Sequence, residues 1–181
     1  MSLDRHLERW AVHHRGEPFD TIFVWLSKAG SNGLVWVLIA LAIAIAYRRY
    51  PLFGMTLLTV LVADTSNFVL KEVFDRERPN VRYAEPEPLM RAPSSNSFPS
   101  GHAATSFAAA TVIGAAAPRL RAPLYVLAAL IAWSRVYIGV HYPLDVVAGA
   151  LYGLALGLLL VRALPPLAEF LLRSLRARRQ G

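Results

Sequence analysis

The stretch GLVWVLIALAIAIAY, residues 33–47, contains no charged side chain. Four further stretches are predominantly apolar, namely residues 52–70, 102–117, 122–140 and 143–164. A helix needs about 20 mostly apolar residues to cross the hydrocarbon core of a bilayer, and several of these stretches approach that length. Composition agrees, because 55% of the 181 residues are hydrophobic and the mean hydropathy is +0.40. We therefore predict an all-α integral membrane helical bundle with five transmembrane helices.

The N-terminal segment, residues 1–30, is expected to form amphipathic or short helices ahead of these five. Residues 3–14 alternate charged with apolar side chains, which is typical of a helix that lies in the membrane interface. Residues 19–29, FDTIFVWLSKA, are apolar but short. They form either an abbreviated sixth span or a second helix along the surface, and the side on which the N-terminus lies depends on which is correct.

The charge and residue usage of the chain exclude several functional classes. The formal charge is +7, but the basic residues flank apolar stretches, which fits anionic lipid headgroups. No basic stripe with stacking aromatic residues is present, so we expect no nucleic-acid partner. The chain has no cysteine, which excludes disulfides and thiol catalysis. Its length and the absence of internal repeats favour one membrane-embedded domain over residues 1–181.

The distribution of arginine predicts an orientation in the membrane. Counting spans places three basic groups on one side, and these are Arg48 with Arg49, Arg119 with Arg121, and the C-terminal Arg173, Arg176, Arg178 and Arg179. By the positive-inside rule this side is cytoplasmic, as is the C-terminus. The loop 71–101 and the turn near residue 141 then lie on the extracytoplasmic side of a bacterial plasma membrane.

Three polar clusters share that extracytoplasmic side. They are KEVFDRERP at 71–79, PSGH at 99–102 and SRVYIGVHYPLD at 134–145. Their candidate site residues are Lys71, Arg78, Ser100, Gly101, His102, Arg135, His141 and Asp145. Three permanent cations with small hydrogen-bond donors complement a group that carries several anionic oxygens.

The second cluster is the start of an apolar stretch. If a helix begins near Ser100, its first amides have no partner within the helix and form a ready anion site. Gly101 lets a ligand approach the backbone closely, and His102 lies beside it as a proton donor. A purely structural interpretation, in which Ser100 is only a helix cap, stays open.

The third cluster supplies a candidate nucleophile. His141 and Asp145 are four residues apart, with Pro143 at a favourable first helical position. The carboxylate can reach back to a ring N–H of His141 and leave the other nitrogen free to attack. Arg135 and Asp145 both lie in apolar surroundings, where an unpaired charge costs about 3 kcal/mol or more, so we expect them to pair directly or through a ligand.

Asp64 and Asn67 also interrupt an apolar stretch. Polar side chains inside spans often hydrogen-bond to neighbouring helices. We therefore interpret both residues as structural partners between helices and leave them outside the site.

Taken together, the clusters resemble the signature of the type 2 phosphatidic acid phosphatase superfamily. That signature is Lys, six residues and Arg-Pro, then Pro-Ser-Gly-His, then Ser-Arg, five residues, His, three residues and Asp. This sequence matches it at Lys71 to Pro79, at Pro99 to His102 and at Ser134 to Asp145. The resemblance implies a helical membrane bundle that removes phosphate from a lipid.

The resemblance also implies residue roles. His141 attacks phosphorus and forms a phosphohistidine, Asp145 orients His141, and His102 protonates the leaving oxygen. Lys71, Arg78, Ser100, Gly101 and Arg135 hold the phosphoryl oxygens. Because three fixed cations can stabilise a phosphoryl group, we expect no metal and no cofactor.

Several functions remain open on sequence alone. Among lipid substrates we predict undecaprenyl diphosphate, with phosphatidylglycerol phosphate, phosphatidic acid and a lipid A phosphate as alternatives. A haloperoxidase uses a similar constellation but is soluble. A non-enzymatic lipid-phosphate binding or transport protein would need only the cations, whereas this sequence also has His102 and the His141–Asp145 pair. Sequence does not give the oligomeric state.

Overall fold

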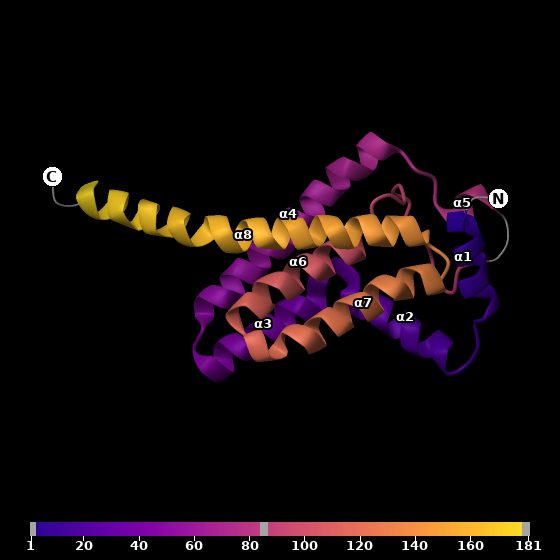
Figure 1. Cartoon of the computed structure of the whole chain (residues 1–181), viewed down its shortest axis with the longest axis horizontal. Coiled ribbons are helices and arrows are strands. Elements are labelled where there is room, and N and C mark those ends of the chain that lie inside the picture. Colours follow the sequence, from indigo (N-terminus) through magenta and orange to yellow (C-terminus); the bar gives the residue numbers. More distant parts are fainter. Residues whose placement is uncertain (1–2, 84–86, 179–181) are drawn as a thin grey trace.

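The computed structural model describes residues 3–83 and 87–178, with side chains described as far as residue 164. Its α-helices are α1 (Leu3–His13), α2 (Phe19–Gly30), α3 (Leu34–Tyr47), α4 (Tyr50–Phe74), α5 (Pro79–Arg82), α6 (Gly101–Ala116), α7 (Arg121–Tyr137) and α8 (Pro143–Arg178). Two short 3-10 turns, η1 (Ser31–Gly33) and η2 (Pro118–Leu120), complete the set. The predicted all-α class is confirmed (Figure 1).

Helix α6 forms the centre of the bundle and packs against α4, α7 and α8. It is built largely from small residues, and most of its length from Ala103 to Gly114 is buried. A helix that is apolar on every side is expected in the interior rather than on a surface. The position of α6 therefore brings its N-terminus, where Gly101 and His102 are half-buried, against the neighbouring helices.

The α6–α8 contact is unusually close because α8 presents glycine at every fourth position. A Cβ on Gly149 would come within 2.4 Å of the carbonyl oxygen of Ser100, and one on Gly153 within 2.2 Å of that of Ala104. Small residues at this spacing let two helix backbones approach each other in membrane proteins. The packing fixes the N-terminal ends of α6 and α8 side by side, where the Ser100 N–H donates to the Asp145 carbonyl oxygen at 2.9 Å.

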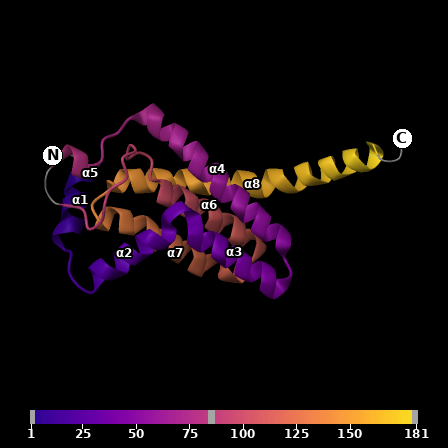
Figure 2. The same cartoon turned by 180° about the vertical axis from the view of Figure 1, so that it is seen from behind.

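Residues 19–29 form neither a separate sixth span nor a surface helix. They belong to α2, the first half of a broken helix that continues through η1 into α3, and Figure 2 shows the two halves following one another along the bundle. Together Phe19–Tyr47 has the length and composition of a span, and its most apolar stretch of 18 residues has a mean hydropathy of 2.0. The break lies at Asn32 and Gly33, whose φ values of 51° and 67° are left-handed, a region that these two residue types tolerate best.

The number of helices that can cross a membrane by their own length differs from the prediction of five. In the described part of the chain, three candidate spans are long and apolar enough: Phe19–Tyr47, Tyr50–Arg82 and Pro143–Leu164. Helices α6 and α7 occur where spans were predicted but have only 16 and 17 residues. Such helices are roughly 25 Å long, less than the hydrocarbon thickness, and α6 is covered by its neighbours.

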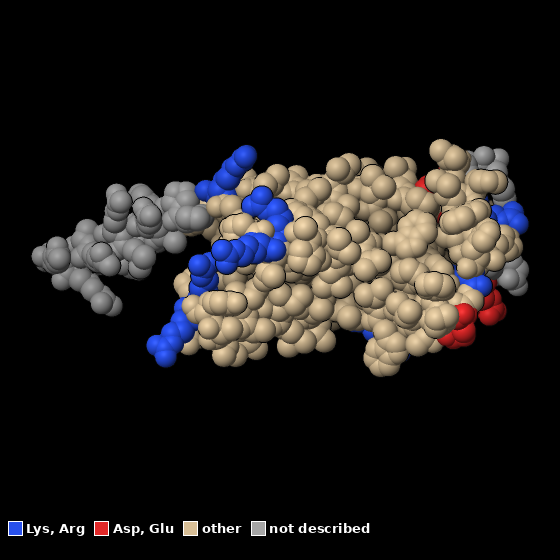
Figure 3. Space-filling view, turned by 60° about the horizontal axis from the view of Figure 1, so that its bottom comes forward, with Lys and Arg blue, Asp and Glu red and all other residues tan. Residues whose placement is uncertain are grey.

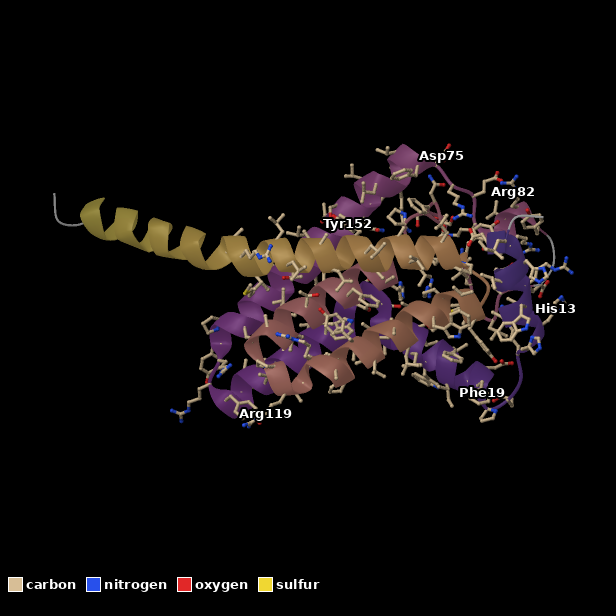
Figure 4. All side chains as sticks on the ribbon, in the orientation of Figure 1. His13, Phe19, Asp75, Arg82, Arg119 and Tyr152 are labelled. Carbon is tan, nitrogen blue, oxygen red and sulfur yellow. The ribbon has the colours of Figure 1, made fainter. Side chains whose placement is uncertain are left out.

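The two ends of the bundle carry the charge. On the face shown in Figure 3, Lys, Arg, Asp and Glu gather near the ends, and the surface between them is almost free of charge. Figure 4 places Arg119 at the end opposite to Asp75 and Arg82. At the Arg119 end, Arg49 Nη1 donates to the Ala116 carbonyl oxygen at 2.6 Å, which brings two of the predicted basic connections together. The side chains of the C-terminal group lie outside the described residues.

The opposite end is formed by the segment between α4 and α6 together with α1. Lys71 lies in the last turn of α4, so the predicted loop 71–101 begins four residues later than expected and contains the short helix α5. Helix α1 lies across this end, where Asp4 Oδ1 accepts the Leu144 N–H at 2.8 Å. The N-terminal helix is therefore on the same side of the bundle as that loop.

Candidate active site

A cavity of about 230 Å³ lies where α4, η1, α6 and the α7–α8 turn meet. Six of the eight predicted site residues line it, namely Lys71, Arg78, Gly101, His102, Arg135 and His141. Ser100 and Asp145 are fully buried beside it. The structure thus brings together three stretches that are far apart in the sequence.

His141 lies in the turn between α7 and α8 and is 2% exposed. Its Nδ1 is 3.3 Å from Asp145 Oδ2, and its Nε2 is 3.1 Å from Arg78 Nη1. An ionised carboxylate only accepts and a guanidinium only donates, so Nδ1 carries the proton and Nε2 presents its lone pair. The predicted contact between Asp145 and the ring is confirmed.

The charge state of His141 follows from its surroundings. Burial disfavours the imidazolium, and the nearby cations Arg78 and Arg135 disfavour it further, so the pKa of His141 lies well below its usual value. The ring is therefore neutral at neutral pH. A neutral, oriented imidazole is the form that can act as a nucleophile.

Asp145 is held in place by groups that the sequence analysis did not single out. Its Oδ2 also accepts the Tyr142 N–H at 2.9 Å, and its Oδ1 accepts from Arg76 Nη1 at 2.5 Å. Arg76 Nη2 in turn donates to Asp4 Oδ2 at 2.5 Å. An N-terminal carboxylate and a loop arginine therefore fix the carboxylate that orients His141.

Arg135 does not pair directly with Asp145, which was one of the two arrangements expected from the sequence. Its Nη1 donates to Ser27 Oγ, and its Nε is buried with no hydrogen-bond partner among the described residues. Asp145 lies behind His141 at the start of α8, whereas Arg135 faces the cavity from the last turn of α7. The tight turn between the two helices separates the two charges, and Arg76 is the arginine that pairs directly with Asp145.

The other two cations are anchored by uncharged groups. Arg78 donates to the carbonyl oxygens of Ser95 and Val140 at 2.6 and 2.9 Å, and Lys71 Nζ is 3.1 Å from Ser95 Oγ. Both are buried, with 2% and 8% exposure. Among the described residues, neither they nor Arg135 form an ion pair with a carboxylate. Buried charge without a counterion is costly, so the cavity is built to receive an anion.

His102 lies in the first turn of α6 and faces α2. Its Nε2 is 3.1 Å from the Ser27 carbonyl oxygen, which can only accept, so Nε2 carries a proton. Ser27 thus positions both His102 and Arg135, although no signal in the sequence pointed to it. The nitrogen of His102 that remains for proton transfer is Nδ1.

The N-terminus of α6 begins at Gly101, as predicted. Ser100 is the N-cap residue, but its side chain makes no capping hydrogen bond, and its Oγ is buried without a partner among the described residues. The structural interpretation of Ser100 as a helix cap is therefore wrong for its side chain. The first-turn amides remain available to an anion in the cavity.

Asp64 and Asn67 belong to the cavity wall, which corrects their assignment as purely structural residues. Asn67 Nδ2 does contact another segment, at 3.4 Å from the Pro99 carbonyl oxygen. Within the described chain, no group of three His, Asp or Glu side chains is placed to hold a metal ion. The positive charge of the site comes from Lys71, Arg78 and Arg135.

The sequence model of the PAP2 superfamily matches residues 51–168, which contain all three clusters and the cavity's cations. The chain belongs to the PAP2 superfamily. It is 35% identical over 135 residues to an undecaprenyl-diphosphatase of Sulfolobus acidocaldarius, an alignment that covers 73% of this chain and 64% of that protein. The chain thus spans slightly less than two thirds of that relative.

Two solved structures share the fold. The crystal structure of Aquifex aeolicus LpxE matches with a TM-score of 0.77 and 31% identity, covering 90% of this chain and 96% of that one. A transmembrane phosphatidylglycerolphosphate phosphatase from Bacillus subtilis matches with a TM-score of 0.71 and 29% identity, covering 87% and 82%. The predicted family is therefore confirmed, and the solved structures share the all-α membrane fold predicted for this chain.

The PAP2 signature identified most of the charged groups around the cavity but not the groups that support them. Arg76 lies between two signature positions, and the alternating DRER pattern at 75–78 was its only signal in the sequence. Ser95 contacts Lys71 and Arg78 from a polar loop of ordinary composition. These supporting contacts depend on chain segments that meet only in the folded protein.

Proposed function

We propose that this PAP2 protein is a metal-independent lipid phosphatase that cleaves a phosphate ester or diphosphate through a phosphohistidine at His141. The observation that carries the proposal is the neutral His141 ring, whose Nε2 faces three buried cations that lack a carboxylate partner. Binding an anion would need the cations alone. The oriented ring beside them supports turnover.

In the first step, Lys71, Arg78 and Arg135 bind the phosphoryl oxygens together with the amides at the start of α6. Arg78 transfers its hydrogen bond from His141 Nε2 to a phosphoryl oxygen, and the Nε2 lone pair attacks phosphorus. The bond between phosphorus and the leaving oxygen breaks. The negative charge of the bound phosphate favours the imidazolium form of His102, which keeps its Nε2–H on the Ser27 carbonyl and gives its Nδ1 proton to that oxygen.

In the second step, neutral His102 removes a proton from water, and the hydroxide attacks the phosphohistidine. The phosphorus–nitrogen bond breaks, inorganic phosphate leaves, and both rings return to their starting states. Asp145 stabilises the positive charge that develops on His141 during both steps, and Arg76 holds Asp145 in position. Positioning and electrostatic stabilisation are the main needs of phosphoryl transfer, and side chains supply both.

The substrate and orientation are extensions of this proposal. The relatives' names include a diphosphatase and a phosphatidylglycerolphosphate phosphatase, so both kinds of lipid are candidates. The sequence-based preference for undecaprenyl diphosphate stays a prediction. We place the site at the extracytoplasmic face of a bacterial plasma membrane, with residues 1–181 acting as one domain and the C-terminus in the cytoplasm. The support for this orientation is that the two basic connections, Arg48 with Arg49 and Arg119 with Arg121, lie at the opposite end.

Phosphate release from purified protein tests the proposal. The panel contains undecaprenyl diphosphate, phosphatidylglycerol phosphate, phosphatidic acid and a lipid A phosphate, each with and without EDTA. We expect release by wild type in EDTA, loss in His141→Ala, and a phosphorylated His141 in alkali-quenched protein by mass spectrometry. Equal release by His141→Ala would defeat the assignment, and lipid movement in vesicles without release would favour a transport protein.

A further inference from the structure

The charge of the side chains that line the site cavity changes along α4. The residues that α4 contributes are Asp64, Asn67, Phe68 and Lys71, which follow the three- and four-residue spacing of one helix face. Lys71 lies near the end of α4 beside the other cations, and Asp64 lies two turns deeper in the bundle, about 10 Å along the axis. The cavity therefore has a cationic end and an end that contains a carboxylate.

Asp64 is an exposed carboxylate in the middle of a membrane-spanning helix. Among the described residues it makes no hydrogen bond or ion pair, although its charge acts on Lys71 through space. A charged side chain in a span is costly unless it faces a polar cavity or a partner. Because Asp64 lines the cavity, it has polar surroundings, but no hydrogen-bond donor of the described protein contacts its carboxylate.

Asn67 presents a second unused acceptor one turn away. The side chain is 3% exposed, and its Nδ2 donates to the Pro99 carbonyl oxygen. Its Oδ1 is buried with no hydrogen-bond partner among the described residues. A buried acceptor without a donor is unfavourable by about 1–3 kcal/mol, so the site is better satisfied when a ligand brings a donor.

A lipid bound with its phosphate at the cations must pass this region. The acyl or prenyl chains run into the bilayer, so the atoms that join them to the scissile phosphate lie deeper along α4 than Lys71. Those atoms belong to the leaving group. They meet Asp64 and Asn67, which offer oxygen acceptors.

We propose that Asp64 and Asn67 form a leaving-group subsite that accepts hydrogen bonds from hydroxyl groups next to the scissile phosphate ester. The preferred substrates are then phosphomonoesters of hydroxyl-bearing lipid alcohols, such as glycerol or sugar derivatives. This inference rests on the proposed phosphatase function and narrows it.

The same subsite disfavours a diphosphate, which reverses the sequence-based preference for undecaprenyl diphosphate. A second phosphate would place negative charge beside the Asp64 carboxylate, and repulsion between like charges is strong where water is largely excluded. It would also bring acceptors rather than donors to Asn67 Oδ1. A hydroxyl, in contrast, donates to either oxygen.

A matched pair of substrates isolates the hydroxyl. The first is a 1-O-alkylglycerol 3-phosphate with its 2-hydroxyl free, and the second is the 2-O-methyl ether of the same lipid. Farnesyl diphosphate serves as the diphosphate. We expect wild type to hydrolyse the free alcohol with a kcat/KM about tenfold to a hundredfold above that of the ether, because one hydrogen bond to a charged acceptor is lost.

Variants assign that preference to the carboxylate. Asp64→Asn should bring the ratio between alcohol and ether close to one and raise kcat/KM for farnesyl diphosphate relative to both. Glu72→Gln is the matched control, because Glu72 is an exposed carboxylate of α4 that does not line the cavity, and it should keep the wild-type ratios.

The outcomes separate this inference from the phosphatase itself. If wild type releases phosphate but shows no preference for the free alcohol, or if Asp64→Asn leaves the preference unchanged, the subsite is refuted while the phosphatase stands. If wild type prefers the diphosphate and Asp64→Asn does not increase that preference, the charge argument fails. Absence of release from these three compounds and from all four lipids of the panel above would overturn the proposed function and the subsite with it.

Discussion

The two ends of the bundle both carry arginine, but the residues behave differently. Arg78 and Arg135 are each 2% exposed and hold fixed positions around the site cavity. Arg48 and Arg119 at the opposite end are exposed. That end has a larger cavity of about 470 Å³, yet its lining is mainly apolar. Buried cations without counterions, rather than the size of a cavity, mark the reactive end.

The largest effect is expected when His141, the proposed nucleophile at the site end of the bundle, is replaced. His141→Ala removes the attacking nitrogen, so we expect phosphate release to fall about 10⁴-fold or more. Release of inorganic phosphate from mixed micelles measures the change. A variant that retains more than a tenth of the wild-type rate would show that the reaction does not pass through His141.

Removing one buried cation should have the next largest effect. Arg78→Gln loses a charged phosphoryl contact, and we expect kcat/KM to fall about 10²–10³-fold. Burial and then the charge of Arg78 keep the pKa of His141 low, so the variant raises that pKa. Because attack requires the neutral ring, the acid limb of the kcat/KM profile should move to higher pH. A lower rate with an unshifted acid limb would separate phosphate binding from the control of His141.

Arg76 does not contact His141 itself but holds Asp145, the carboxylate that orients the His141 ring. Arg76→Gln removes the contact to Asp145 Oδ1, and we expect kcat to fall about tenfold to a hundredfold with little change in KM. Arg76→Lys should recover part of the loss, because it restores the charge. Steady-state kinetics on one lipid phosphate measures both. A change confined to KM would instead place Arg76 at the substrate.

The contact between α6 and α8 can be weakened by a substitution that leaves the residues of the site cavity unchanged. Gly153→Ala forces α6 and α8 apart, because the new Cβ meets the Ala104 carbonyl, and overpacking of this kind costs about 1–3 kcal/mol. The midpoint of thermal unfolding in detergent should fall. Gly54→Ala is the control, since nothing lies within 4 Å of its added Cβ, and an equal fall there would refute the packing explanation.

The smallest effect on catalysis is expected from a substitution at the end of the bundle that carries Arg119. Arg119→Ala removes an exposed charge at the end of the bundle opposite to the site cavity, so we expect kcat and KM within about twofold of wild type, as is usual for exposed charges. The same phosphate-release assay checks this. A large loss in purified, folded protein would mean that the exposed arginines take part in the reaction.

Much of the site could be predicted because its spacing is local. Lys71 and Arg78 frame one cluster, and His141 and Asp145 lie one helical turn apart in another, so the residue types and intervals alone indicate their chemistry. The break at Asn32 was not predictable in the same way. An apolar stretch does not show whether two helices are separate or continuous, and the left-handed residues there pack against α4 and α6.

By itself, the sequence determined the helical membrane class, the family and the identity of most of the polar groups that line the site cavity. All three follow from hydropathy and from short spacings between residues, which can be read directly from the order of residues along the chain. Only the tertiary structure decided that Arg76 rather than Arg135 pairs with Asp145, that Ser27 positions His102, and that Asp64 lines the cavity. Those partners are brought together by helix packing, because the close glycine contact between α6 and α8 sets which distant side chains share one desolvated space.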